Sequence, residues 1–246
     1  MQTTQTTQKL FQLKLHGMAQ AFEDQLASAH AQSLGFEERF GMVVDAETTY
    51  RDNARLQRLL RQAKFHVPAS VDQVIQSPER NLKSSTVENL RTCTWIAKGQ
   101  NLVMTGATGT GKTWLACAFG HQACRKGYSV LFQRLSMMLE DLKIARADGS
   151  FKRKIAALAR YDLLILDDLG SSDTFLPEYR EYLLEVVDAR IGIHSTVMTS
   201  QYPVSRWHDY LSGGNPTVAD AILDRLLSGA IIVELKGDSL RSKRVE

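Results

Sequence analysis

The chain has 246 residues, 43% of them hydrophobic and 23% charged, with a formal net charge of +3. This length exceeds that of a typical single domain, so we expect one α/β core with a small appendage. No apolar run approaches the roughly 20 residues that span a bilayer, and residues 1–15 lack the apolar core and cleavage site of a signal peptide. These features argue against membrane and exported proteins, and we expect a cytoplasmic protein.

Cysteine usage agrees with a reducing compartment. Cys93, Cys117 and Cys124 are odd in number and lack C-x-x-C spacing. Cys117 and Cys124 fall on one face of a predicted helix, so buried thiols are expected rather than metal ligands. The histidines show no metal-ligand spacing either.

The N-terminal part of the chain is predicted to be helical. Apolar residues within residues 8–33 recur at helical spacing and predict one amphipathic helix. They are Leu15, Met18, Ala19, Phe22 and Leu26. Gly35 ends this helix, and residues 36–64 predict further helices.

Two prolines, Pro68 and Pro78, interrupt the helical pattern. We therefore expect an N-terminal helical domain over residues 1–67. Residues 68–98 then form a linker that contains one helix, over residues 84–98.

The sign of the charge reverses within the helical part. Residues 21–50 contain six carboxylates against one cation, Arg39, and a basic stretch follows. Arg51, Arg55 and Arg58 fall within about 60° of one another on a helix. This face either contacts DNA phosphates without reading sequence, or it is a solvated face balanced by the acidic helices. No aromatic residues interleave with the cations, so stacking on single-stranded DNA is not favoured.

From residue 99 onward, short apolar runs alternate with helical stretches. The runs that predict strands are residues 101–105, 129–133, 163–167, 195–200 and 230–235. This alternation is typical of a parallel sheet with helices on both faces. We therefore predict an α/β domain over residues 99–246, built on a five-stranded parallel sheet.

A complete phosphate-binding loop follows the first predicted strand. It has the pattern G-x-x-x-x-G-K-[ST] and consists of Gly106, Ala107, Thr108, Gly109, Thr110, Gly111, Lys112 and Thr113. The preceding strand and the following helix are the context that this motif needs. Backbone N–H groups of such a loop point at phosphate oxygens, and the helix N-terminus favours the same anion. The sequence therefore predicts a nucleotide-binding protein of the P-loop NTPase class.

Three residues around the start of the following helix have distinct expected roles. Lys112 reaches the β- and γ-phosphates of ATP, and the Thr113 hydroxyl holds Mg²⁺. Trp114 comes next in the chain and is included among the nucleotide-binding candidates.

A second basic cluster, Lys152, Arg153 and Lys154, follows the turn at residues 148–150. It lies between the second and third predicted strands. The cluster either contacts DNA or begins a solvated helix.

The third predicted strand ends in two acids, Asp167 and Asp168. The carboxyl end of a buried parallel strand opens at the ligand crevice, so both acids are expected beside the phosphates. Asp167 is expected to hold Mg²⁺, and Asp168 to polarise the attacking water. The alternative is an acid pair that only begins a turn, and the phosphate loop earlier in the chain weakens it.

Two further candidates come from later elements. Gln201, which follows the fourth predicted strand, is the first choice to orient the attacking water, and Thr199 is the second. A plain turn leading to Pro203 is the alternative. Arg225, late in the helix before the last strand, either reaches the γ-phosphate of a neighbouring subunit or is a solvated arginine paired with a carboxylate such as Asp224.

Several blocks of the sequence resemble the IstB family, the ATP-binding helper proteins of bacterial insertion-sequence transposition. They are GATGTGKT at 106–113, LLILDDLG at 163–170, VMTSQYPVSRWHDYL at 197–211 and PTVADAILDRLLSGAIIVELKGDSLR at 216–241. LGFEERFGMVVDAE and RDNARLQRLLRQAKF extend the resemblance to the N-terminal part, so that it covers nearly the whole chain. Many NTPases share the phosphate loop, whereas the blocks around Gln201 and Arg225 are more specific.

The resemblance implies an AAA+ ATPase of the initiator and helicase-loader type, related to DnaC and lacking a C-terminal helical lid. It would assign the Walker-A pair to Lys112 and Thr113, the Walker-B pair to Asp167 and Asp168, sensor I to Gln201 and the arginine finger to Arg225. Arg241 either serves as sensor II from the tail or is exposed. Asp168 stands where most AAA+ proteins have Glu, and its shorter side chain suggests slow hydrolysis.

The resemblance also implies partners and cofactors. Such proteins assemble on DNA as ATP-bound oligomers, with ATP and Mg²⁺ as cofactors, and recruit or activate a transposase. We therefore expect binding to double-stranded DNA through its backbone, to a transposase and to further copies of the chain, with ATP hydrolysis as a timing switch. A DnaC-like helicase loader acting on single-stranded DNA is the alternative, and a small-molecule kinase is disfavoured by the acid pair that ends the third strand.

Overall fold

The computed structural model describes residues 2–172, 174–213 and 216–240. The chain divides into two compact units, Met1–Arg58 and Leu59–Glu246. This division falls inside one long helix, α4 (Phe36–Ala63).

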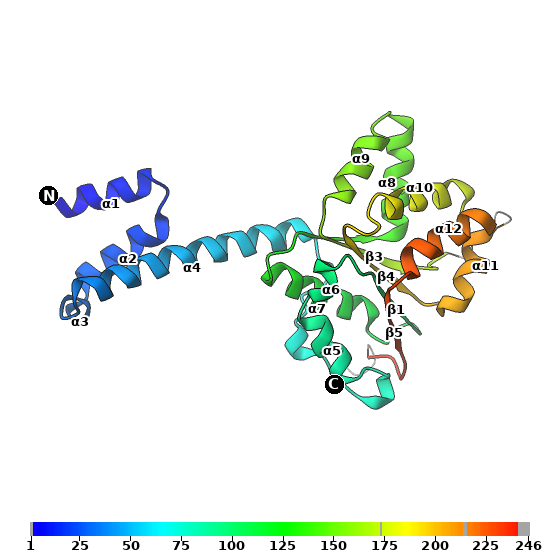
Figure 1. The fold of residues 1–246 in the computed structure, drawn as a ribbon, viewed down its shortest axis with the longest axis horizontal. Coiled ribbons are helices and arrows are strands. Elements are labelled where there is room, and N and C mark those ends of the chain that lie inside the picture. Colours follow the sequence, from blue (N-terminus) through cyan, green and yellow to red (C-terminus); the bar gives the residue numbers. More distant parts are fainter. Residues whose placement is uncertain (1, 173, 214–215, 241–246) are drawn as a thin grey trace. The chain divides into compact units, whose positions relative to one another are not determined.

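The N-terminal unit consists of helices. They are α1 (Gln2–Gln12), α2 (His16–Ala27), α3 (Ala29–Gln32) and the larger part of α4 (Figure 1). The prediction of a single helix over residues 8–33 is therefore wrong. Between α1 and α2, Lys14 adopts a left-handed φ of 60°. Ser28 is extended, and its hydroxyl accepts a hydrogen bond from the Ala31 N–H, so it begins α3 as an N-cap.

α2 and α4 pack closely at Gly17. A Cβ atom at this position would lie 2.6 Å from the carbonyl oxygen of Ala46 and 2.7 Å from the Cα of Glu47, so a larger residue would displace α4. The Glu47 carboxylate is buried and accepts a hydrogen bond of 3.0 Å from the Met18 N–H. These contacts fix α2 against the middle of α4.

α4 is one continuous helix of 28 residues, whereas the sequence pattern predicts several helices over residues 36–64. The stretch contains no proline, so the backbone hydrogen-bond ladder is not interrupted. Lys64 follows α4 with a left-handed φ of 55°, the conformation in which helices commonly end.

Four short helices lead from α4 to the sheet. They are the 3₁₀ helices η1 (Val71–Gln73) and η2 (Pro78–Arg80), followed by α5 (Ser84–Arg91) and α6 (Thr94–Ala97). The predicted single helix over residues 84–98 is thus two helices, divided at Cys93, whose φ is 59°. The indole N–H of buried Trp95 donates to the carbonyl of Leu90. This hydrogen bond closes α5 and α6 into one compact corner.

Five parallel strands form the sheet of the second unit. They are β1 (Leu102–Gly106), β2 (Val130–Arg134), β3 (Leu163–Leu169), β4 (Ser195–Ser200) and β5 (Ile231–Leu235). Their order is β2-β3-β4-β1-β5, with every neighbouring pair parallel. The predicted five-stranded parallel sheet is confirmed. The predicted limits agree to within one residue, except that β3 continues two residues further to Leu169.

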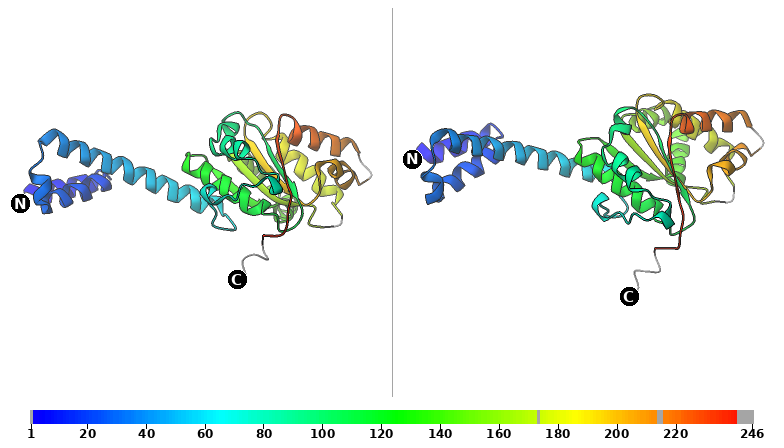
Figure 2. Two further views of the ribbon diagram at one scale, coloured as in Figure 1. Left: turned by 90° about the horizontal axis from the view of Figure 1, so that it is seen from below. Right: turned by 60° about the horizontal axis from the view of Figure 1, so that its bottom comes forward.

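Helices cover both faces of the sheet (Figures 1 and 2). On one face lies α7 (Lys112–Arg125), where a Cβ at Gly120 would lie 2.9 Å from Cδ1 of Ile165. The other face carries α8 (Leu135–Ala147), α9 (Phe151–Ala159), α10 (Pro177–Asp188), η3 (Val204–Arg206), α11 (Trp207–Ser212) and α12 (Pro216–Leu227). Buried residues of α8, α9, α10, α11 and α12 form one apolar cluster with Leu164 and Leu166, which alternate with Ile165 along β3.

Candidate nucleotide-binding site

The phosphate loop connects β1 to α7 at the carboxyl edge of the sheet. A Cβ at Gly106 would lie 2.4 Å from the carbonyl oxygen of Leu235, so glycine is needed where β1 and β5 lie this close. Gly111 is the N-cap of α7 with a left-handed φ of 93°. The first N–H groups of a helix lack intrahelical partners, and together with the helix dipole they favour an anion such as phosphate.

Lys112 is buried within this loop. Its ammonium donates to the carbonyl oxygens of Gly106 at 2.7 Å and of Ala107 at 2.9 Å. The Thr110 hydroxyl donates to the same Ala107 oxygen at 2.8 Å. Trp114 is half-buried in the first turn of α7. The loop is therefore folded around a cation at the position where phosphates are expected.

Asp167 of β3 lies beside Thr113 of the loop. The Thr113 hydroxyl is 3.0 and 3.1 Å from the two carboxylate oxygens, and the Thr199 hydroxyl of β4 donates to one of them at 2.7 Å. Burial raises the pKa of Asp167, and the two threonine hydroxyls oppose that shift. The structure thus brings the phosphate loop and the carboxyl ends of β3 and β4 together at the Asp167 carboxylate.

Asp168 occupies an irregular point in β3. Its φ is 73°, and the register with β4 shifts between Leu166 and Leu169. The Asp168 N–H donates to the Thr199 hydroxyl at 2.9 Å, which satisfies a backbone group that regular pairing would have used. Such an irregularity re-aims a side chain, and here it presents the Asp168 carboxylate to Gln201.

Gln201 connects the phosphate loop with the acid pair. Its Nε2 donates to the Asp168 carboxylate at 3.3 Å, and its Oε1 accepts from the Thr108 hydroxyl at 2.8 Å. Thr199, the second candidate, is buried and donates to Asp167. The two candidates therefore donate to different carboxylates, and of the two Gln201 also contacts the loop.

Arg225 lies on α12, and its ion-pair partner is Asp188 at the end of α10 rather than Asp224. The Nε–Oδ1 distance is 2.6 Å, and Nη1 donates to the carbonyl of Ala221 at 3.0 Å. The Arg225 side chain remains 29% exposed. An arginine so placed is held in one orientation while part of its side chain faces solvent.

Arg80 and Leu240, which no predicted role singled out, also approach the loop. Arg80 Nη2 donates to the carbonyl of Thr110 at 2.9 Å, and the Leu240 N–H donates to the carbonyl of Gly109 at 3.0 Å. Both contacts use backbone carbonyls of the loop, so no side-chain motif indicates them. Arg241, the sensor-II candidate, follows Leu240 and lies outside the described residues.

The three arginines of the predicted basic face, Arg51, Arg55 and Arg58, are all exposed on α4. Arg51 pairs with Glu47, four residues earlier, at 2.7 Å. One of the two alternatives for this face was that acidic residues balance its charge. At Arg51 such a pairing is present.

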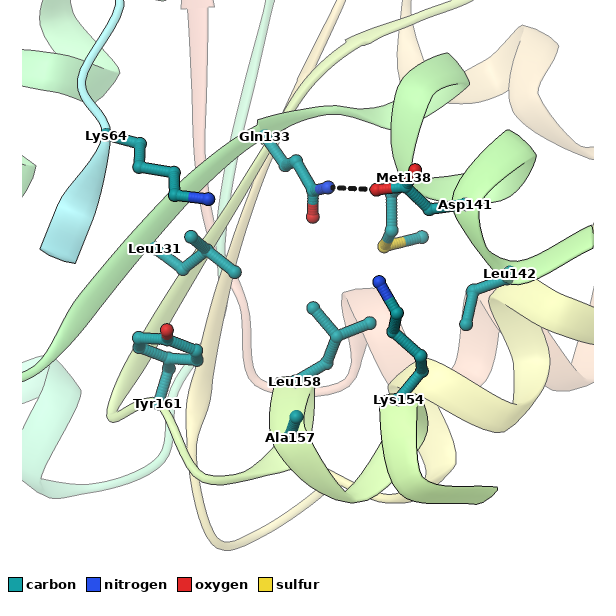
Figure 3. Close-up of a pocket in the computed structure, with 10 residues that line it drawn as sticks. All are labelled: Lys64, Leu131, Gln133, Met138, Asp141, Leu142, Lys154, Ala157, Leu158 and Tyr161. Atoms are coloured by element: carbon teal, nitrogen blue, oxygen red, sulfur yellow. Dashed lines mark hydrogen bonds between the residues drawn. The ribbon is translucent and has the colours of Figure 1, made fainter. Parts of the chain in front are cut away.

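The second basic cluster lies at the start of α9, where Lys152, Arg153 and Lys154 are exposed. Figure 3 shows the ammonium groups of Lys154 and Lys64 pointing into one cavity of about 210 Å³ beside β2. Apolar side chains line much of the remainder: Leu131, Met138, Leu142, Ala157 and Leu158. Lys64 thus adds a cation to this surface that its position in the sequence did not indicate.

Oxygen ligands for Mg²⁺ are available at the loop. In the part of the chain that the structure describes, no group of three or more histidine, cysteine or carboxylate side chains could hold a metal ion. Mg²⁺ commonly takes only one or two carboxylates together with phosphate oxygens and water. The Thr113 hydroxyl and the Asp167 carboxylate, 3.0 Å apart, fit that pattern.

Two further expectations concern the chain as a whole. Cys117 and Cys124 are buried free thiols, as predicted, and Cys93 is a buried free thiol as well. Burial raises the pKa of Cys93 and of Cys117 to about 11 and that of Cys124 to about 12. No helix within the described ranges is long and apolar enough to cross a bilayer.

Residues 8–246 match the family model of the IstB-like ATP-binding proteins. The chain is 42% identical over 241 residues to the putative insertion sequence ATP-binding protein y4uH of Sinorhizobium fredii, covering 97% of this chain and 95% of that protein. It is 46% identical over 206 residues to the putative ATP-binding protein of insertion sequence IS1162 from Pseudomonas fluorescens, covering 83% and 89%. The fold is similar to the crystal structure of the DnaC helicase loader, with a TM-score of 0.55, 21% identity, and coverage of 68% of this chain and 97% of that one.

Proposed function

Since the chain belongs to the family of IstB-like ATP-binding proteins and has an AAA+ fold like that of DnaC, we propose that it is a Mg²⁺-dependent ATPase that assists transposition. An ATP-bound oligomer would assemble on duplex DNA, recruit and stimulate a transposase, and hydrolyse ATP as a timing switch. One observation carries the ATPase part of this proposal. Hydrogen bonds join the phosphate loop to the polar ends of β3 and β4, through Thr113 and Asp167 on one side and through Thr108, Gln201 and Asp168 on the other.

Hydrolysis requires that a water oxygen bond to the γ-phosphorus while the bond from that phosphorus to the β–γ bridging oxygen breaks. The loop N–H groups and Lys112 would hold the phosphates, with the ammonium exchanging loop carbonyls for phosphate oxygens. The Asp168 carboxylate would accept a hydrogen bond from the attacking water, with Gln201 orienting both. Asp168 is half-buried, so water can reach it.

Mg²⁺ would be held by the Thr113 hydroxyl and the Asp167 carboxylate. When bound, it would neutralise charge on the β- and γ-phosphates. Thr199 donates to Asp167 and thereby orients that carboxylate toward Thr113. The raised pKa of Asp167 reflects burial of a carboxylate, and a nearby cation would favour its charged form.

Arg225 is proposed to complete the site of a neighbouring copy. Its partly exposed guanidinium would leave Asp188 and bind the neighbour's γ-phosphate. Arg241 is proposed as sensor II; the tail returns to the loop at Leu240, one residue before it.

DNA binding is proposed for residues 1–67 together with the start of α9, with residues 68–98 as linker and residues 99–246 as the ATPase. Arg51, Arg55 and Arg58 would contact phosphates from the first, and Lys152, Arg153 and Lys154 from the second. Lys64 and Lys154 line one cavity of about 210 Å³, which the Asp141 carboxylate also lines (Figure 3). Contacts to phosphate alone carry no sequence information, which suits a helper that binds many DNA sites.

Hydrolysis by the Asp168→Asn variant tests the ATPase assignment. The variant should bind ATP like the wild type and hydrolyse it slower by a factor on the order of 10². Asp209→Asn, at a carboxylate that is 92% exposed on α11, is the matched control and should hydrolyse at the wild-type rate. Undiminished phosphate release by Asp168→Asn would contradict the assigned role.

A further inference from the structure

Arg80 is set in a rigid turn of the linker. The Ser77 hydroxyl accepts the Glu79 N–H at the start of η2, and Asn81 closes the turn with a left-handed φ of 54°. Leu82, which is buried, pairs with Ser77 in an isolated antiparallel bridge. The backbone on both sides of Arg80 is therefore held by its own segment.

The guanidinium of Arg80 joins this turn to the phosphate loop. Nη1 donates to the carbonyl of Ile75 at 2.5 Å, and Nη2 donates to the carbonyl of Thr110 at 2.9 Å. A Cβ at Gly111 would lie 3.2 Å from the same Nη2, so the charge contacts the peptide that links Thr110 to Gly111. Burial lowers the pKa of Arg80, but an arginine remains charged in proteins.

The contact bears on phosphate binding through the chemistry of that peptide. The Thr110 carbonyl and the Gly111 N–H belong to one planar group. A charged donor on the carbonyl fixes the plane and polarises the group, so its N–H becomes a stronger donor. The N–H groups of this loop are the ones expected to cradle phosphate.

The same residue also holds the segment that follows β5. The Arg80 carbonyl accepts from the Lys236 N–H at 3.1 Å, and four residues later Leu240 donates to Gly109. Gly109 is needed here, because a Cβ would lie 2.2 Å from the Ser239 hydroxyl. At least three hydrogen bonds thus join the linker, the tail and the loop, and two of these three involve Arg80.

We propose that Arg80 is a positioning residue for the phosphate loop: its guanidinium orients the Thr110–Gly111 peptide for phosphate and couples the linker to nucleotide binding. This role rests on the proposed binding of ATP by the loop. It does not depend on hydrolysis, on DNA or on the arginine finger.

The test compares full-length Arg80→Ala, Arg80→Lys and Arg91→Ala by titration with fluorescent ATP and ADP analogues. Arg91 is the matched control, since it lies in the same linker and pairs with Asp72 and Glu88 rather than with the loop. We expect Arg80→Ala to weaken both nucleotides about tenfold. The affinity of Arg80→Lys, which keeps one charged donor, should stay within about threefold of that of the wild type. The control Arg91→Ala should bind both nucleotides with wild-type affinity.

Two further readouts separate positioning from folding. Guanidinium ions at low concentration should restore part of the affinity of Arg80→Ala but none of that of Lys112→Ala. The thermal midpoint without nucleotide should be the same for Arg80→Ala and Arg91→Ala. The positioning role would be overturned if neither the Arg80→Lys substitution nor added guanidinium restored the affinity for nucleotide. It would also be overturned if the loss of affinity came with a lowered thermal midpoint.

The remaining outcomes are equally decisive. Wild-type affinity in Arg80→Ala overturns the positioning role alone. A wild-type chain that binds no more nucleotide than Lys112→Ala contradicts the proposed function and this role with it.

Discussion

The two units of this chain offer a contrast in the burial of particular apolar side chains. In the second unit, Leu163, Leu164, Ile165 and Leu166 of β3 are completely buried. In the N-terminal unit, the stacked rings of Phe36 and Phe40 are 79% and 54% exposed. A unit with a complete core can hold a site in fixed geometry, whereas exposed apolar groups on a charged helix are typical of surfaces that bind partners.

Buried polar groups show the same contrast. The second unit buries Asp167, Thr199 and Lys112 and gives each a hydrogen-bond partner. In the N-terminal unit, Glu47 is buried but pairs with Arg51, whose side chain is 62% exposed. The first arrangement suits catalysis, whereas in the second one partner of the ion pair stays exposed at the surface.

The largest expected effect is on ATP hydrolysis by the second unit, which contains Arg225. Arg225→Ala should retain ATP binding and lose hydrolysis by a factor on the order of 10³, because its guanidinium is proposed to complete the site of another copy. Steady-state phosphate release measures the rate. Asp188→Ala, which removes the ion-pair partner and keeps Arg225, should retain hydrolysis. Equal losses in both variants would assign Arg225 a structural role.

The next prediction concerns the free energy of unfolding and compares a buried side chain of the second unit with an exposed ring of the N-terminal unit. Leu164→Ala removes a buried side chain from the sheet and should lower the free energy of unfolding by about 2–5 kcal/mol. Phe36→Ala, at an exposed ring, should change it by less than about 0.5 kcal/mol. Denaturant titrations followed by circular dichroism measure both values. A comparable loss in Phe36→Ala would show that the exposed rings stabilise the fold and are not free for a partner.

A smaller effect is expected on the salt dependence of DNA binding. Arg58→Ala should reduce the slope of log Kobs against log salt by about 0.9 for each phosphate that Arg58 neutralises. Arg51→Ala should reduce it less, because Glu47 already neutralises that arginine. Anisotropy titrations at several salt concentrations give the slopes. Unchanged slopes in both variants would mean that this face is only solvated.

The smallest effect concerns pH. Cys124 has an ordinary pKa of 9.0 in the unfolded chain and about 12 when folded, because burial disfavours its thiolate. The unfolded state therefore loses its proton first, and stability should fall as the pH rises above 9 and on toward 12. Thermal midpoints measured from about pH 8 to about pH 11 should decline more for the wild type than for Cys124→Ala. Equal declines of the thermal midpoint in the two proteins would show that the pKa of Cys124 is not raised by folding.

Sequence patterns predicted the parts of this molecule that depend on short stretches of chain. The strands, the phosphate loop and the two acids near the end of β3 follow from local apolar runs and one motif. The contacts of Gln201 with Thr108 and of Thr199 with Asp167 depend on the strand order, which places β4 between β3 and β1. No local pattern contains that order.

Other features escaped prediction for different physical reasons. The apolar residues that predicted a helix within residues 8–33 all lie between the breaks at Lys14 and Ser28, so their periodicity indicates α2 and does not mark its ends. Arg80 contacts a backbone carbonyl, which every residue type supplies. Arg225 pairs with Asp188, which is distant in the sequence.

The most direct test of the proposed function is fluorescence anisotropy with random-sequence duplex and single-stranded DNA, in the presence of ATP, ADP or no nucleotide. The wild type should bind duplex DNA tightly and cooperatively with ATP and weakly otherwise, and Lys112→Ala should not respond to ATP. A preference for single strands, or no DNA binding at all, would contradict the transposition-helper role and favour a helicase loader or another protein-directed ATPase.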